Sequence, residues 1–165
     1  MQGEANFAAG VIEGFFGRSW DWSARHSCPD FLRRHGYQFY IYAPKGDPYL
    51  RRRWREPLPE ETLRQLNSLS AKCRASAVRF GIGLTPFEIY LNYDAAARSA
   101  LRSKVLQLND VGVDVLCILF DDMRGDIEEI ARIQARVIAD VSGWSDAGRS
   151  EWPRRKRTQS PAGPL

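Results

Sequence analysis

The chain has 165 residues, which is enough for one domain with a substantial core. Hydrophobic residues make up 44% of it and charged residues 27%, as in ordinary globular proteins and unlike disordered segments. The sequence contains no apolar run of membrane-spanning length and no export signal at its start, so we expect a cytoplasmic protein without a membrane partner.

The net charge of +4 is concentrated near the C-terminus, where the basic run of residues 154–157 lies. The body of the chain is close to neutral, which argues against a nucleic-acid partner. Cys28, Cys73 and Cys117 are far apart in the sequence, a pattern that favours free thiols in a reducing compartment over a disulfide framework.

Four apolar stretches alternate with helical patterns along the chain. The stretches 8–14, 37–43, 77–84 and 113–120 are rich in β-branched or aromatic residues and nearly continuous in apolarity, which predicts parallel strands covered on both faces. Repeated βα units of this kind indicate an α/β fold with a parallel sheet. A flavodoxin-like open sheet and one half of a (β/α)8 barrel are both compatible with the pattern, since a full barrel needs about 250 residues.

The helical patterns differ in how clearly they begin and end. In the first, within 21–35, Pro29 predicts a kink or a late start, and Gly36 is expected to end the helix. Asp94 is a candidate N-cap of the third helix, Gly112 is expected to lie just beyond its end, and Asp126 is a candidate N-cap of the fourth. The apolar faces consist of Leu63, Leu66, Leu69 and Cys73 in the second helix, Leu101, Val105 and Leu108 in the third, and Ile127, Ile130, Ile133 and Val137 in the fourth.

The C-terminal segment lacks this periodicity. We place a folded α/β domain at residues 5–142 and an irregular or disordered basic tail at 143–165. The arginine-rich stretch 50–57 is interpreted as a solvated helix start anchored by Trp54.

Polar and flexible residues follow each predicted strand. Gly14 comes after the first strand, Lys45 after the second, and the adjacent Asp121 and Asp122 after the fourth. Because sites in parallel α/β folds form at the carboxyl ends of the strands, these residues are candidates for one site. Two close carboxylates suit acid–base work, because one of them can hold its proton while its neighbour stays charged.

Each of these features also has a plain structural interpretation. Gly14 can serve a tight turn, Lys45 can form a solvated pair with Asp47, and Asp122 can cap the following helix. The histidines and cysteines show no zinc spacing, and no phosphate-binding glycine motif is present, so we expect neither a metal nor a cofactor. A magnesium site at the acidic stretch 121–126 is the competing chemical interpretation.

Four segments together resemble one known family. "GVIEGFFGRSW", "YIYAPKGDPYLRRRWREP", "GIGLTPFEIY" and "LFDDM" resemble, in order and approximate spacing, the motifs of glycoside hydrolase family 84, the β-N-acetylglucosaminidases that include O-GlcNAcase. The resemblance covers roughly residues 9–140. It implies the first four βα units of a (β/α)8 barrel, hence a half-barrel, and a domain truncated relative to the family.

The resemblance also implies a reaction and roles for the candidate residues. The family removes terminal β-linked N-acetylglucosamine with retention, and the substrate's own acetamide attacks to give an oxazoline intermediate. Asp121 would orient the acetamide N–H, and Asp122 would act as general acid and base. Lys45 would bind sugar hydroxyls, and the backbone at Gly14 would contact the sugar.

The expected partner is therefore a glycan or glycoprotein carrying N-acetylglucosamine. A homodimer or a complementing half-barrel would close the open sheet. The alternative is a catalytically inactive fragment that acts at most as a weak binding or pairing module.

Overall fold

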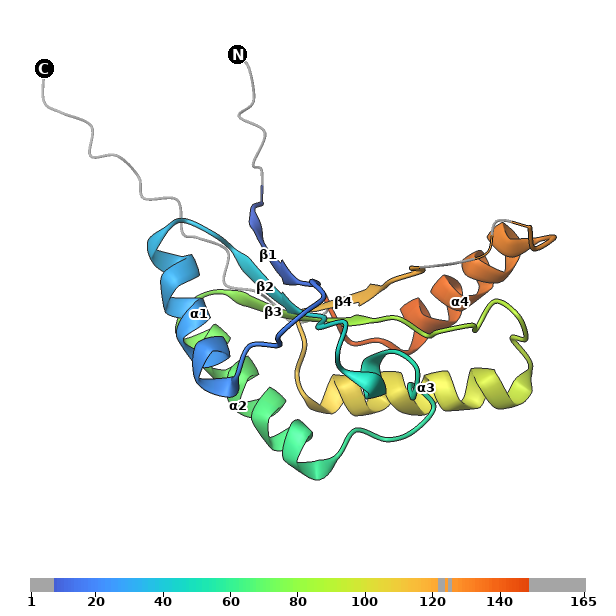
Figure 1. Cartoon of the computed structure of the whole chain (residues 1–165), viewed down its shortest axis with the longest axis horizontal. Helices are drawn as coiled ribbons and strands as arrows, with labels where there is room; N and C mark the ends of the chain where they lie inside the picture. The colour runs from blue at the N-terminus through green and yellow to red at the C-terminus, as the bar shows by residue number, and fades with distance from the viewer. Residues whose placement is uncertain (1–7, 122–123, 125, 149–165) are drawn as a thin grey trace, which may run out of the picture.

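The computed structural model describes residues 8–121, 124 and 126–148, and its centre is a parallel sheet (Figure 1). The four strands lie in the order β1-β2-β3-β4 and all neighbours are parallel. The prediction of an α/β fold with a parallel sheet is confirmed. The strands are β1 (Gly10–Glu13), β2 (Phe39–Tyr42), β3 (Arg79–Leu84) and β4 (Val115–Ile118).

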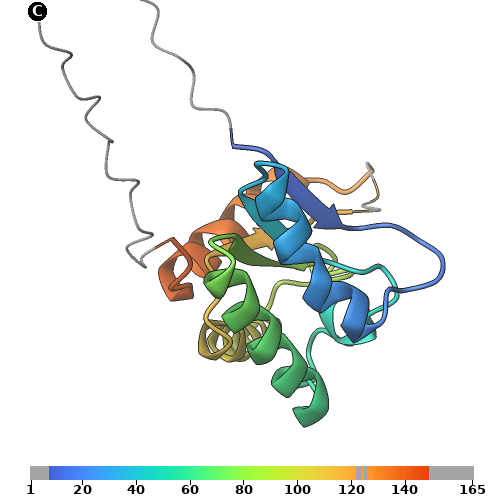
Figure 2. The same cartoon turned by 90° about the vertical axis from the view of Figure 1, so that its left-hand side faces the viewer.

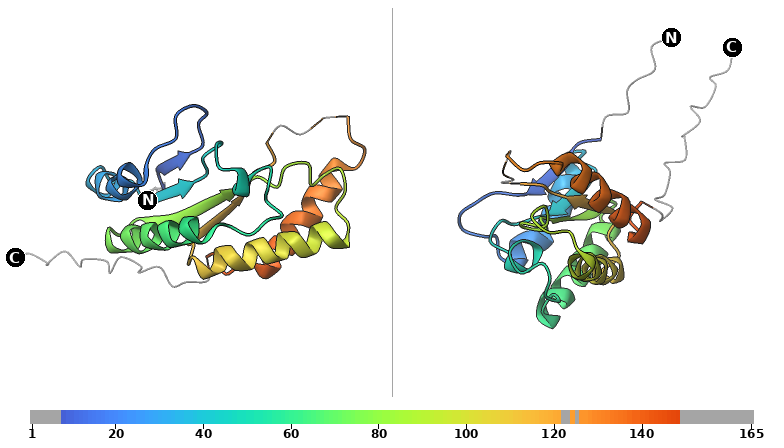
Figure 3. Two further views of the ribbon diagram at one scale, coloured as in Figure 1. Left: turned by 60° about the horizontal axis from the view of Figure 1, so that its bottom comes forward. Right: turned by 90° about the vertical axis from the view of Figure 1, so that its right-hand side faces the viewer.

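A helix follows every strand, which gives four βα units in sequence. Helices α1, α2 and α3 lie below the sheet in the view of Figure 1, and α4 lies beside β4. Helix α1 packs against α2 (Figure 2), and α3 packs against α4 (Figure 3). The helices are α1 (Trp22–Arg34), α2 (Glu60–Ala75), α3 (Ala95–Asp110) and α4 (Ile130–Trp144), with a short 3-10 helix, η1 (Pro48–Leu50), between β2 and α2.

The two faces of the sheet carry different side chains, because successive residues of a strand point to opposite sides. One face packs on the helices and includes Tyr40, Tyr42, Phe80 and Ile82, all at most 3% exposed. Together with the helix faces predicted for α2 and α3, they form the main core. The helix-facing strand residues thus provide the large side chains of the core.

On the other face of the sheet, small residues lie among larger side chains where the strands crowd. A Cβ atom on Gly83 of β3 would lie 2.6 Å from Cβ of Ala43 and 2.9 Å from Cδ1 of Leu119. One on Gly81 would meet Ile41 and Val115 at about 3.0 Å. Glycine at these positions lets neighbouring side chains pack across β3.

Two predicted helix starts differ from the structure. Helix α1 begins at Trp22, where Asp21 accepts a 2.7 Å hydrogen bond from the Ala24 amide, and it continues through Pro29. Of the two alternatives predicted from Pro29, a kink or a late start, the late start is therefore wrong. Helix α4 begins at Ile130, four residues beyond Asp126, whose carboxylate instead accepts hydrogen bonds from Arg124. Asp126 is therefore not the cap of α4.

The predicted ends of two helices are confirmed. Gly36 adopts φ 79° directly after α1, and Gly112 adopts φ 73° after α3. Asp94 caps α3 by accepting a 2.8 Å hydrogen bond from the Ala97 amide.

The stretch after β2 forms η1 and turns rather than the start of a helix, which corrects that interpretation. Trp54 is nevertheless fully buried and donates a hydrogen bond from Nε1 to the Phe87 carbonyl, as an anchor does. At the other end of the chain, Gly143 lies within α4, and the Gly148 amide donates to the Asp114 carbonyl. The domain boundary at 142/143 stays a prediction, and residues 149–165 of the predicted tail lie outside the described residues.

The three cysteines are free thiols, as predicted. Burial raises the pKa of Cys73 to about 12. Across the described ranges, no helix is both long and apolar enough to cross a membrane.

Candidate active site

The candidate residues lie just beyond the strands, at the carboxyl edge of the sheet. Lys45 follows β2, Thr85 follows β3 and Asp121 follows β4. By strand alternation all three share the face of the small residues, since Lys45 is two positions beyond Ala43 and Thr85 two beyond Gly83. The sheet therefore aims these side chains at one region.

The central feature of the site is an ion pair between Lys45 and Asp121. The Lys45 ammonium donates a hydrogen bond to Oδ2 of Asp121, although the residues are 76 positions apart in the sequence. The side chains are 15% and 34% exposed, so the pair is partly sheltered yet reachable from solvent. Lys45 therefore does not form the solvated pair with Asp47 that its sequence position also allowed.

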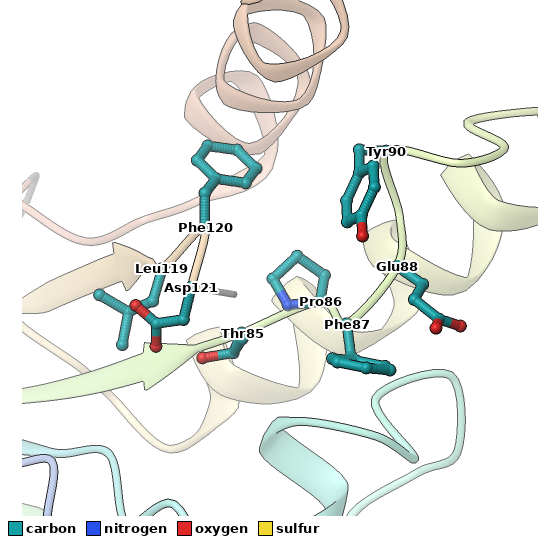
Figure 4. Close-up of a pocket in the computed structure, with 8 residues that line it drawn as sticks. All are labelled: Thr85, Pro86, Phe87, Glu88, Tyr90, Leu119, Phe120 and Asp121. Atoms are coloured by element: carbon teal, nitrogen blue, oxygen red, sulfur yellow. The ribbon is translucent and has the colours of Figure 1, made fainter. Parts of the chain in front are cut away.

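A small hollow lies beside Asp121, between the loops that follow β3 and β4 (Figure 4). Asp121 and Thr85 sit at the ends of their strands, whereas Phe120 points to the opposite side, toward α4 (Figure 4). The enclosed volume is about 10 Å³, which is room for one water molecule. A ligand larger than a water molecule therefore cannot lie inside this hollow. The other lining residues are Pro86, Phe87, Glu88, Tyr90 and Leu119.

Gly14 directly follows β1, and its amide donates a 2.9 Å hydrogen bond to the Ile12 carbonyl. A Cβ atom at Gly14 would make only an ordinary 3.5 Å contact with Ile12, so packing within the described residues does not require glycine there. The neighbouring Gly17, with φ 111°, is the residue that serves the turn. Asp122, the fourth candidate, lies outside the described residues.

A buried charged residue that we did not single out from the sequence stands next to Gly14. The Glu13 side chain is 0% exposed and accepts three hydrogen bonds of 2.8–3.2 Å from Arg25. The Tyr40 hydroxyl also donates to it. An acid inside the apolar stretch "GVIEG" was the available signal, because a buried carboxylate needs partners.

The cluster raises the pKa values of the two partners of Glu13, Arg25 and Tyr40. Burial lowers the pKa of Arg25, but its hydrogen bond with Glu13 raises it, and the net pKa lies above the ordinary value. Burial, followed by the interactions with Glu13, raises the pKa of Tyr40 far above its usual range. Both partners of Glu13 therefore keep their protons at neutral pH.

Metal binding finds no support in the ranges that the structure describes. They contain no group of three or more His, Cys, Asp and Glu residues arranged to hold a metal ion. Asp126, part of the acidic stretch, pairs with Arg124 on an exposed turn.

Comparisons with known proteins indicate the family of the chain. The model of a family described as beta-N-acetylglucosaminidase matches residues 9–153. The "Protein O-GlcNAcase" sequences of Rattus norvegicus and Mus musculus are each 31% identical over 121 residues, which cover 73% of this chain and 13% of the relative.

Two solved structures are also similar. A structure of CpGH84B superimposes with a TM-score of 0.74 at 30% identity, over 82% of this chain and 24% of that chain. A mutant of the Thermobaculum terrenum O-GlcNAc hydrolase gives a TM-score of 0.75 at 30% identity, over 82% of this chain and 31% of that chain.

The fold and the site define this domain as a half-barrel with polar residues at the ends of its strands. The chain belongs to the β-N-acetylglucosaminidase family, glycoside hydrolase family 84. It spans only a minor part of the length of each of these relatives.

Proposed function

We propose that the domain removes terminal β-linked N-acetylglucosamine from a glycan or glycoprotein, with retention and through an oxazoline intermediate. The observation that carries the proposal is the contact between Lys45 and Asp121, which brings two of the family-motif residues to one rim from different strands. Membership of the family supports the substrate class.

Each residue has a defined role in this reaction. Asp121 accepts a hydrogen bond from the acetamide N–H, so that the acetamide oxygen is held for attack on the anomeric carbon. Asp122 protonates the departing oxygen and afterwards takes a proton from water. Lys45 donates to sugar hydroxyls, and Gly14 offers backbone at a position where a side chain would obstruct the ligand.

The described strands supply one side of such a barrel. The two edge strands, β1 and β4, each pair with one neighbour in the described sheet, which leaves an edge open at each end. We propose that a second copy completes the pocket, with β4 of one copy beside β1 of the other, as a complementing half-barrel.

The direct test is hydrolysis of a fluorogenic β-N-acetylglucosaminide by the wild type and by Asp121→Asn and Asp122→Asn. We expect each substitution to lower kcat/KM by about 10²-fold or more, since each removes a group that handles a proton or the acetamide. Asp126→Asn is the matched control, because that aspartate is close in sequence, exposed, and paired with Arg124 on the surface. It should retain wild-type activity.

Two outcomes contradict the proposal. A folded wild type without hydrolysis favours the inactive fragment. Activity that chelator abolishes and magnesium restores favours the metal-dependent interpretation of the acidic stretch.

A further inference from the structure

A series of buried and half-buried contacts runs from the first strand to the loop that carries Lys45. It starts at the Glu13–Arg25 pair, whose side chains are 0% and 6% exposed. Glu13 is adjacent to Gly14 in the sequence, so the fixed carboxylate also restrains the backbone at the end of β1. Separating the two side chains would leave each charge buried without its partner, which is unfavourable. The Glu13–Arg25 pair therefore holds both side chains in one position and serves as an anchor.

Arg25 also contacts the aromatic ring of Tyr42, so the position of Tyr42 depends on that of Arg25. The guanidinium lies 4.7 Å from the centre of the Trp22 ring and 5.0 Å from that of the Tyr42 ring. The two rings are themselves stacked, with centres 5.8 Å apart and planes inclined by 16°. Cation–π contact and stacking together fix the orientation of the Tyr42 ring.

The Tyr42 hydroxyl then reaches the Lys45 loop through Asp47. It donates a 2.9 Å hydrogen bond to Oδ2 of Asp47. Oδ1 of Asp47 accepts from the amides of Tyr49 (2.9 Å) and Leu50 (3.3 Å). The Asp47 amide donates to the Pro44 carbonyl at 3.0 Å, which closes the turn that contains Lys45. Asp47 therefore ties both the turn and η1 to the sheet.

We propose that Tyr42 and Asp47 are positioning residues for Lys45: with the Glu13–Arg25 pair as their anchor, they fix the turn that presents the ammonium to Asp121 and to the substrate. This inference rests on the proposed function for its kinetic effect. Its structural part, the restraint of the turn, stands apart from any activity.

A second tyrosine–aspartate contact provides a matched control. The Tyr93 hydroxyl donates a 2.7 Å hydrogen bond to Asp140, which also pairs with Arg98 and so joins α4 to α3. Tyr93→Phe removes the same kind of hydrogen bond as Tyr42→Phe, but from residues that do not line the candidate site. Any general loss of stability should affect both variants.

The experiment compares Tyr42→Phe, Asp47→Ala, Asp47→Asn and Tyr93→Phe by steady-state kinetics and thermal unfolding. Loss of one hydrogen bond of roughly 1–1.5 kcal/mol corresponds to about a tenfold change. We expect Tyr42→Phe and Asp47→Ala to raise KM about tenfold with little change in kcat, because Lys45 binds the substrate before and during reaction. Asp47→Asn should remain near wild type, since asparagine can cap η1 and bond the hydroxyl. Tyr93→Phe should lower the thermal midpoint without a change in KM.

Amide hydrogen exchange separates failure of this inference from failure of the proposed function. In Tyr42→Phe the amides of Tyr49 and Leu50 should exchange at least several-fold faster than in Tyr93→Phe, whether or not the protein hydrolyses the substrate. Unchanged exchange at these amides overturns the inference. So does a KM that rises equally in Tyr93→Phe, since the effect would then be one of stability alone.

Discussion

Lys104 is a single buried charge that contacts the segment following the Lys45 turn. It lies on α3, is 3% exposed, and donates a 2.6 Å hydrogen bond from Nζ to the Glu56 carbonyl. Burial lowers its pKa to about 8, although Asp47 and Glu56 act in the opposite direction. The Lys104 hydrogen bond thus restrains the segment around Glu56, which follows the Lys45 turn. Burial of the ammonium opposes this arrangement, because it disfavours the charged form of the side chain.

The sign of its pH effect follows from the lowered pKa. Between pH 8 and 10.5 the unfolded chain keeps a proton on Lys104 that the folded chain has lost, so this group makes stability rise with pH. The rise should amount to roughly 3 kcal/mol in the free energy of unfolding between pH 7.5 and 10.5. Urea unfolding at pH 7.5, 9 and 10.5 should show a smaller rise for Lys104→Met than for the wild type. Lys72→Met, on the exposed side of α2, is the control, and an equal slope in Lys104→Met would contradict the prediction.

For individual residues, part of the candidate site could be predicted from the sequence. Gly14, Lys45, Asp121 and Asp122 were identifiable because they follow apolar strands and because the motifs resemble one family. The contact between Lys45 and Asp121 was not, since it joins distant segments and depends on strand order. Glu13 gave a signal, a lone acid among apolar residues, but its partner Arg25 could not be distinguished from the other arginines of an arginine-rich chain.

At the scale of elements, the same change from glycine to alanine should have opposite effects in a strand and in a helix. Gly83→Ala in β3 forces a methyl group against Ala43 and Leu119, and should lower the free energy of unfolding by about 1–3 kcal/mol. Gly143→Ala in α4, where no atom lies within 4 Å of the added Cβ, should raise it by about 0.5–1 kcal/mol. Denaturant unfolding of both variants checks this, and destabilisation of equal size in both would refute it.

Element types were predictable where a periodic apolar face exists and less so at helix starts. The faces of α2 and α3 are buried as expected, because leucines at helical spacing have no other favourable arrangement. The start of α4 was misplaced, since Asp126 bonds Arg124 locally and the residue before the helix, Glu129, adopts φ 60°. Local pairing of this kind competes with capping and leaves no periodic signal.

For the whole molecule, the open sheet edges determine the expected assembly. Ile12 on β1 is 51% exposed, so a lysine there should obstruct pairing with a second copy at little cost to the fold. By light scattering we expect the wild type at twice the chain mass of 18.8 kDa, and Ile12→Lys at the chain mass. Leu106→Lys on α3, where the leucine is 44% exposed, is the matched control and should remain a dimer. A monomeric wild type at tens of micromolar would rule out pairing by a second copy.

The separation of contacts along the chain implies an order in which the site is assembled during synthesis. The Tyr40–Glu13 bond spans 27 positions and the Tyr42–Asp47 bond five, whereas the Lys45–Asp121 bond spans 76. Because a ribosome releases the N-terminal part first, the early contacts can form while later strands are still being made. We therefore expect Lys45 to be in place before Asp121 leaves the exit tunnel, so that Asp121 is the last of these residues to join the site.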